Sequence, residues 1–138
     1  MNSRTQAVEC DATELETEAF LLDQKALNNI RAVHRDGAPK LLEKVIKIYF
    51  ENSPKLLQTL RDAVAGNDTA EMIGAAAHSL KSSSANLGAT KLAALCGDLE
   101  RMAQESCTRG AKAILNEIEK LYPLVCDSLA AECENDVR

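Results

Sequence analysis

The sequence has very few aromatic residues: its 138 residues include no tryptophan, two phenylalanines and two tyrosines. Because 46% of the residues are nevertheless hydrophobic, the core must consist of leucine, isoleucine, valine, alanine and methionine. Such a core suits packed helices better than a sheet. No stretch alternates regularly between polar and apolar residues, and no hairpin turn separates β-branched runs. These absences favour an all-α protein, and the length fits a single domain.

Basic residues are also fewer than acidic ones: 16 lysines and arginines stand against 21 aspartates and glutamates, which gives a formal net charge of −5. This balance argues against nucleic acid as a partner, because phosphate backbones select surfaces rich in lysine and arginine. No apolar run reaches about 18 residues, so the sequence predicts no membrane span and no membrane contact by this domain. The polar, acidic segment 1–18 is unlike a signal peptide, and we expect a cytoplasmic location.

Motifs for metals and cofactors are missing as well. The five cysteines form no Cys-x-x-Cys pair, and the two histidines are too few for a zinc site or for the Glu-x-x-His pairs of a di-iron bundle. The sequence has no GxxxxGK[ST] loop, no glycine-rich kinase loop and no aspartate cluster suited to Mg²⁺. We therefore expect reduced thiols and a protein with no metal or cofactor of its own.

Apolar residues recur with helical spacing along most of the chain. A short helix is predicted over 22–34, and a long one over 39–65, with Pro39 in its first turn and a kink at Pro54. The next helix is predicted to begin at the cap Asp68, with Glu71 three residues on, and to end near Gly88. The helix after it is predicted to begin at the cap Thr90 and to end at Gly110. The last helix is lined by apolar residues from 114 to 129 and contains Pro123.

Four long amphipathic helices joined by short turns can bury their apolar faces by packing as an antiparallel up-down-up-down four-helix bundle, which is the predicted fold. The additional short N-terminal helix, 22–34, is expected to cover one end of the bundle. The predicted domain spans residues 19–132, with a polar tail or linker at 1–18 and a C-terminal tail at 133–138. A fold of this kind does not define a function, so a functional assignment must come from a site.

The strongest candidate for a site is His78, in the run from 74 to 89. At about 100° per residue, the side chains within roughly 60° of it are mostly small; they include Gly74, Ala75, Ser82 and Ala85, with Lys81 one turn on. The opposite arc, with Ile73, Ala76, Leu80 and Leu87, is apolar and should face the core. An exposed imidazole in such surroundings is accessible to a large partner, and near neutral pH it is a good nucleophile. The other histidine, His34, lies near a predicted helix end.

The string His-Ser-Leu-Lys-Ser-Ser-Ser-Ala-Asn-Leu-Gly, residues 78–88, closely resembles the phosphoacceptor motif of histidine-containing phosphotransfer (HPt) domains. These domains relay phosphoryl groups in multistep two-component signalling. The resemblance covers roughly residues 20–130 and includes the helix that follows Pro39 and the segment 92–100. Ser82 stands where many members of the family have glycine, and both residues are small.

The resemblance implies that the protein is a phosphocarrier and not an autonomous kinase. His78 would accept a phosphoryl group from a receiver-domain aspartate and pass it to another receiver aspartate. Lys81 would offset the charge of the phosphoryl group, and Glu100 would orient the imidazole. The implied partners are response-regulator receiver domains, which hold their own Mg²⁺, and a histidine kinase. The expected docking face for a receiver consists of Gly74, Ala75, Ser82, Ala85 and Gly88.

The resemblance is to domains associated with hybrid sensor kinases, so the chain would be cytoplasmic as a separate protein or as the C-terminal domain of a membrane-anchored kinase. The main alternative is a helical interaction module that binds partners without phosphotransfer. An acid-labile, base-stable phosphate on His78 would distinguish the two.

Overall fold

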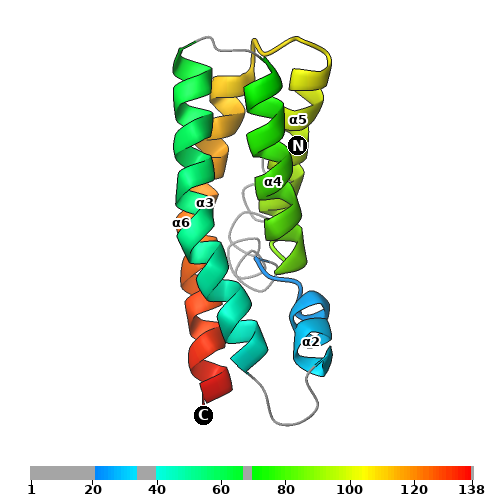
Figure 1. Ribbon diagram of the computed structural model, residues 1–138, viewed down its shortest axis with the longest axis vertical. Coiled ribbons are helices and arrows are strands. Elements are labelled where there is room, and N and C mark those ends of the chain that lie inside the picture. The colour runs from blue at the N-terminus through cyan, green and yellow to red at the C-terminus, as the bar shows by residue number, and fades with distance from the viewer. Residues whose placement is uncertain (1–20, 34–39, 67–69, 138) are drawn as a thin grey trace, which may run out of the picture.

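The computed structural model describes residues 21–33, 40–66 and 70–137, and within these ranges the regular structure is entirely α-helical, as the composition predicted. The long helices stand side by side and a short one lies at one end (Figure 1). In chain order they are α2 (Gln24–Val33), α3 (Lys40–Ala65), α4 (Ala70–Asn86), α5 (Thr90–Gln104) and α6 (Ala111–Val137).

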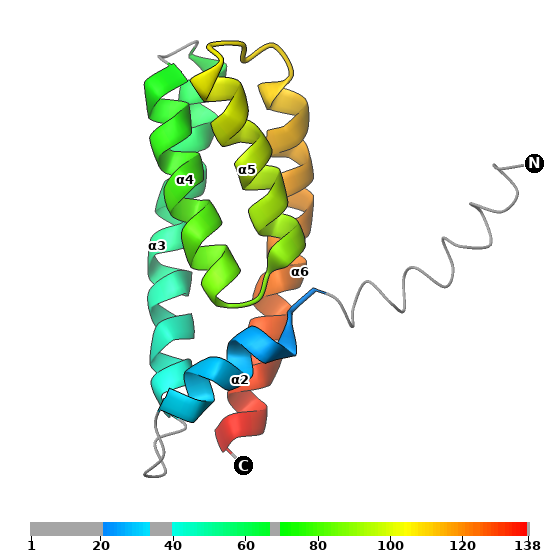
Figure 2. The same cartoon turned by 90° about the vertical axis from the view of Figure 1, so that its right-hand side faces the viewer.

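The four long helices form a closed bundle. Helix α4 packs against α3 and α5, and α6 packs against the same two helices, so that α4 and α6 lie diagonally opposite one another. Consecutive helices run in opposite directions (Figures 1 and 2). The predicted up-down-up-down topology is therefore confirmed.

The long helices have unequal lengths, and α2 fills the resulting space. Helices α3 and α6 have 26 and 27 residues, whereas α4 and α5 have 17 and 15, so the second pair is shorter by about 15 Å. Helix α2 lies below the turn that joins α4 to α5 (Figure 2). It buries Leu27 completely, and its residues Gln24 and Arg31 both donate to the Glu132 carboxylate of α6, at 2.9 and 2.7 Å. The short helix thus covers one end of the bundle, as predicted.

Gly88, in the turn between α4 and α5, is the point where α2 joins the bundle. The backbone N–H of Asp23 donates to the carbonyl of Gly88 at 2.7 Å, and the Asp23 carboxylate accepts from the N–H of Lys25 in the first turn of α2. Gly88 has a φ of +81°, and a Cβ there would lie 2.6 Å from the carbonyl oxygen of Asp23. Gly88 is buried, so its assignment to the docking face was wrong.

Two prolines lie inside long helices, as predicted. Helix α3 continues through Pro54, and α6 continues through Pro123. A proline lacks the N–H that would bind the carbonyl four residues earlier. Beside Pro54, the buried Ser53 hydroxyl donates to the carbonyl of Tyr49 at 2.6 Å.

Tyrosine hydroxyls connect three of the long helices. The Tyr49 hydroxyl of α3 is 2.8 Å from the Ser84 hydroxyl of α4, and Ser53 of α3 is 2.5 Å from the Tyr122 hydroxyl of α6. Burial raises the pKa of Tyr49, and raises the pKa of Tyr122 to about 12, so both remain neutral. Because a buried hydroxyl without a partner is costly, these pairs fix how α3 is aligned with its two neighbours.

Several predicted helix ends differ from the structure. Thr90 is the first residue of α5 and not its cap; the cap is Ala89, which is fully buried and forms no side-chain hydrogen bond. Helix α5 ends at Gln104 and not at Gly110, and a turn with Ser106 at a φ of 54° follows. Helix α6 continues to Val137, past the expected domain end at residue 132. The predicted cap Asp68 and the segment 1–18 lie outside the described residues.

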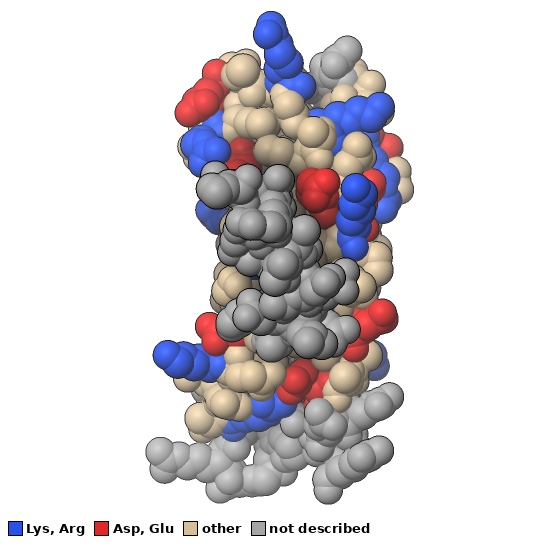
Figure 3. Space-filling model, turned by 180° about the vertical axis from the view of Figure 1, so that it is seen from behind, with Lys and Arg blue, Asp and Glu red and all other residues tan. Residues whose placement is uncertain are grey.

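The core is aliphatic, and leucine supplies most of its large buried side chains, including Leu42, Leu60, Leu80 and Leu99 at 0% exposure. On the face opposite to the view of Figure 1, basic and acidic side chains are interspersed over the part of the surface that the described residues form (Figure 3). None of the described helices is long and apolar enough to cross a membrane.

Replacing Gly88 by alanine should destabilise the fold. The substitution combines a left-handed backbone conformation with a Cβ inside contact distance of Asp23, which should lower the free energy of unfolding by about 2–4 kcal/mol. Chemical denaturation measures this value. Ala85→Ser, on the exposed side of α4, is the control and should change it by less than about 0.5 kcal/mol. Equal stability of Gly88→Ala and the parent would contradict the described junction.

Candidate functional site

Helix α4 has an apolar face and a face of small, exposed side chains, as its sequence predicted. Ile73, Ala76 and Leu80 are buried, whereas His78 is on the exposed side. The His78 side chain is 59% exposed to solvent. The imidazole therefore stands on a convex helical surface, where a large molecule can reach it.

Helices α4 and α5 approach one another closely because Gly74 has no side chain. A Cβ on Gly74 would lie 3.1 Å from the Cβ of Ala103 on α5, a closer contact than most Cβ atoms make. Gly74 is only half-exposed, and its small size serves helix packing as well as access to His78. The close approach brings side chains of α5 within hydrogen-bond distance of His78.

Glu100 of α5 binds both candidate residues of α4. Its Oε2 is 2.7 Å from Nδ1 of His78, and its Oε1 is 2.5 Å from Nζ of Lys81. The Glu100 side chain is 16% exposed and that of Lys81 is 37% exposed. The three residues that the sequence singled out at 78, 81 and 100 thus form one hydrogen-bonded cluster across two helices.

The protonation of this cluster follows from its contacts. The hydrogen bond from Lys81, with a smaller contribution from His78, holds the pKa of Glu100 below its usual value against the opposing effect of burial. Glu100 is therefore ionised at neutral pH and acts only as an acceptor. It follows that Nδ1 of His78 carries the proton in this hydrogen bond, and that Nε2 of the neutral ring has the lone pair.

The cluster has the parts needed for nucleophilic attack by an imidazole. The imidazole is exposed, its Nδ1 is held by the Glu100 carboxylate, and the Lys81 ammonium is bound to the same carboxylate. A carboxylate that accepts from Nδ1–H fixes the tautomer and stabilises positive charge on the ring, as in a Ser-His-Asp triad. A lysine ammonium can neutralise an incoming phosphoryl group as a point charge.

Three residues of the expected docking face are exposed to solvent. Ala75, Ser82 and Ala85 are exposed on α4, and together with His78 they span about three turns of the helix. Gly74 is half-exposed and Gly88 is buried, so the surface available to a partner is smaller than the sequence indicated. None of the three exposed side chains is large enough to cover the imidazole.

Two features near the site were not predicted. Ser84 is buried on the core side of α4 and is paired with Tyr49 of α3. The sequence signal for this pair is a tyrosine within an apolar stripe. Gly97 was also missed: a Cβ there would lie 3.5 Å from Cδ of Lys81. Its signal is a glycine in the interior of a helix, one turn before Glu100.

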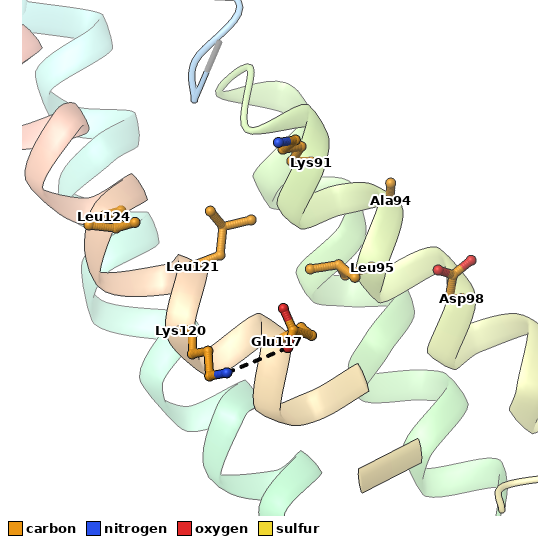
Figure 4. A pocket seen from close by; sticks show the side chains of 8 residues that line it. All are labelled: Lys91, Ala94, Leu95, Asp98, Glu117, Lys120, Leu121 and Leu124. Carbon is orange, nitrogen blue, oxygen red and sulfur yellow. Dashed lines mark ion pairs between the residues drawn. The ribbon is translucent and has the colours of Figure 1, made fainter. Parts of the chain in front are cut away.

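A groove between α5 and α6 lies apart from the His78 cluster (Figure 4). It has a volume of about 420 Å³. The Lys120 ammonium is 3.7 Å from the Glu117 carboxylate in its wall. Neither His78, Lys81 nor Glu100 is among its lining residues, which are Lys91, Ala94, Leu95, Asp98, Glu117, Lys120, Leu121 and Leu124.

The chain is similar to known proteins over most of its length. A family model described as "Hpt domain" matches residues 44–133. Histidine-containing phosphotransfer protein 2 of Arabidopsis thaliana is 26% identical over 107 residues, 76% of this chain and 67% of that protein. Protein 5 of the same name and organism is 21% identical over 110 residues, 78% of this chain and 69% of that protein.

A solved structure agrees with these matches. Histidine-containing phosphotransfer protein B from Pseudomonas aeruginosa PAO1 superposes with a TM-score of 0.71 at 29% identity, covering 83% of this chain and 96% of that one. Since the family model spans well over half of the sequence, the chain belongs to the Hpt domain family, the helical phosphotransfer modules of phosphorelay signalling.

Proposed function

We propose that the protein is a phosphocarrier in which Nε2 of His78 accepts a phosphoryl group from the aspartate of one receiver domain and passes it to the aspartate of another. The observation that carries this proposal is the bond between Nδ1 of His78 and Glu100, at 2.7 Å, on a histidine that is 59% exposed. An accessible ring whose Nδ1 is held by a carboxylate is the arrangement that nucleophilic attack by Nε2 requires.

The transfer step is a displacement at phosphorus. The Nε2 lone pair attacks the phosphorus of an aspartyl phosphate, an N–P bond forms, and the P–O bond to the receiver breaks, so that the receiver regains a free carboxylate. The proton on Nδ1 stays in place, and the ring becomes positively charged. The Glu100 carboxylate, in contact with Nδ1, stabilises that charge, and transfer to the next receiver reverses the step.

Lys81 is proposed to neutralise the phosphoryl group. A phosphoryl group brings about two negative charges to a surface that already contains Glu100. The Lys81 ammonium is bonded to the same carboxylate as His78, so it lies close enough to interact with a group on the ring. A charged hydrogen bond of this kind is worth about 1.5–3 kcal/mol.

The receiver is proposed to supply the remaining catalytic groups. The described residues include no group of three or more side chains suited to hold a metal ion, and receiver domains bind Mg²⁺ beside their own aspartate. The division of labour is then a nucleophile and a docking face on this protein and electrostatic stabilisation of the phosphoryl group by the receiver. The exposed small residues Ala75, Ser82 and Ala85 allow the receiver's active site to close over the imidazole.

His78→Gln should abolish phosphorylation and leave the fold intact. Glutamine is polar and of similar reach, but it has no nucleophilic nitrogen. Incubation with a phosphorylated receiver should label the parent protein with an acid-labile phosphate and leave the variant unlabelled. His34→Gln is the matched control and should be labelled like the parent. Labelling of His78→Gln at the parent rate would show that the acceptor is a different residue.

Glu100→Ala should slow phosphorylation of His78 by a small donor such as phosphoramidate. Loss of the acceptor frees the ring to rotate and to change tautomer, and a charged hydrogen bond is worth about tenfold or more in rate. Glu100→Gln keeps an oxygen that can accept from Nδ1 and should be closer to the parent than Glu100→Ala. If all three proteins were labelled at one rate, Glu100 would have no role in orienting the ring.

Ser82→Tyr should block transfer from a receiver without affecting the chemistry at His78. A large side chain one turn from the imidazole obstructs a docked protein, but phosphoramidate is small enough to pass it. We expect at least tenfold slower transfer from the receiver, unchanged labelling by phosphoramidate, and a free energy of unfolding within about 0.5 kcal/mol of the parent.

The control for added bulk is Asn116→Tyr on α6, the helix diagonally opposite α4, where Asn116 is exposed. This variant should accept phosphate from the receiver at the parent rate. Undiminished transfer to Ser82→Tyr would show that the receiver approaches His78 from another side.

A further inference from the structure

Gly97 occupies a position where the backbone does not require glycine. It lies at the middle of α5, and the one described glycine with a positive φ is Gly88. A Cβ on Gly97 would meet only Cδ of Lys81, at the ordinary contact distance of 3.5 Å. Glycine inside a helix is less stable than alanine because it loses more backbone entropy on folding. The backbone of α5 therefore does not require a small residue at 97, and the reason for one must lie in the neighbouring side chains.

The space above Gly97 is used by the side chain of Lys81. This side chain starts on α4, passes over Gly97, and ends with its ammonium 2.5 Å from Glu100 Oε1, one turn further along α5. The lysine stem is flexible and would otherwise be free to point in many directions. Since a Cβ at 97 already touches Cδ of Lys81, we expect a side chain larger than alanine to compete with the lysine stem for this space. The lack of a side chain at Gly97 thus leaves an open track, a groove across α5 in which the Lys81 side chain lies and reaches the His78 cluster.

We propose that Gly97 is a positioning residue for the phosphoryl group on His78, acting through Lys81. The open track holds the Lys81 ammonium beside the imidazole, where it stabilises the phosphorylated state. This inference rests on the proposed function, because it assigns a role to Gly97 only if His78 is phosphorylated. It predicts that a side chain at 97 acts on the phosphohistidine in the same way as removal of the Lys81 charge.

The test is the lifetime of phosphohistidine after labelling with phosphoramidate, a donor that does not dock as a protein does. Lys81→Ala should shorten the lifetime about tenfold. Gly97→Leu should shorten it by a similar factor, because the leucine displaces the lysine stem. Gly97→Ala should keep the parent lifetime and raise the melting temperature by about 3 °C, because alanine fits and favours the helix.

Two further proteins separate the effect on Lys81 from a general effect of bulk. Ala94→Leu adds the same side chain to an exposed position of α5 that lines the groove with α6, and it should keep the parent lifetime. The double variant Lys81→Ala/Gly97→Leu should have the lifetime of Lys81→Ala alone, because the lysine is the only group through which residue 97 acts. If Gly97→Leu does not fold, Gly97→Gln introduces an unbranched, polar side chain in its place.

The outcomes distinguish this inference from the proposed function. A parent protein that takes up no phosphate on His78 overturns both. A labelled parent with a parent-like lifetime in Gly97→Leu or in Lys81→Ala overturns the role of Gly97 and leaves the phosphocarrier intact. A double variant whose phosphohistidine lifetime is shortened by both factors also overturns the role of Gly97, because residue 97 would then act independently of Lys81.

Discussion

The site depends on the close approach of α4 to α5. Gly74 and Ala103 lie so close that a Cβ on Gly74 would be 3.1 Å from the Cβ of Ala103, closer than most such contacts in proteins. At this separation one carboxylate on α5 reaches both Nδ1 of His78 and the ammonium of Lys81 on α4. If the helices were further apart, Glu100 could not bind the two groups together, and His78 would be an exposed histidine with a freely rotating ring.

Contacts elsewhere in the bundle hold α4 and α5 in this arrangement. The pair of Tyr49 and Ser84, at 2.8 Å, sets α4 against α3 on the side away from Glu100. The turn at Gly88 is held to Asp23 by a backbone hydrogen bond, which attaches the start of α2 to the turn between α4 and α5. A rigid frame lowers the cost of presenting an ordered nucleophile to a partner, because the side chains do not have to be arranged during the encounter.

Much of the fold followed from helical periodicity, which identified the bundle, the continuous helix through Pro54 and the buried arc of Ile73, Ala76 and Leu80. The ends of helices were harder to predict, because they depend on contacts between distant residues. Thr90 has the chemistry of a cap, but the buried Ala89 takes that position. Gly88 was assigned to a partner surface because its contact with Asp23, 65 residues earlier, leaves no periodic signal.

In the site, too, the features set by local periodicity were predicted and those set by contacts between helices were not. Periodicity placed His78 and Lys81 on one face of α4, and the family resemblance suggested Glu100, 22 residues on. That one carboxylate binds both groups could not be obtained from spacing, because it depends on the distance and register of two helices. The track over Gly97 was missed for the same reason: a glycine in a sequence shows missing bulk but not the side chain that uses the space.

The central claim is that Glu100 holds the proton on Nδ1 and leaves Nε2 of His78 as the phosphate acceptor. The most direct measurement is NMR of the phosphorylated protein, with ¹⁵N-labelled histidine and ³¹P detection, after transfer from a phosphorylated receiver. The account predicts a single phosphohistidine, with phosphorus bonded to Nε2 of His78 and the proton retained on Nδ1. Phosphate on Nδ1, or on a serine of α4, would contradict it.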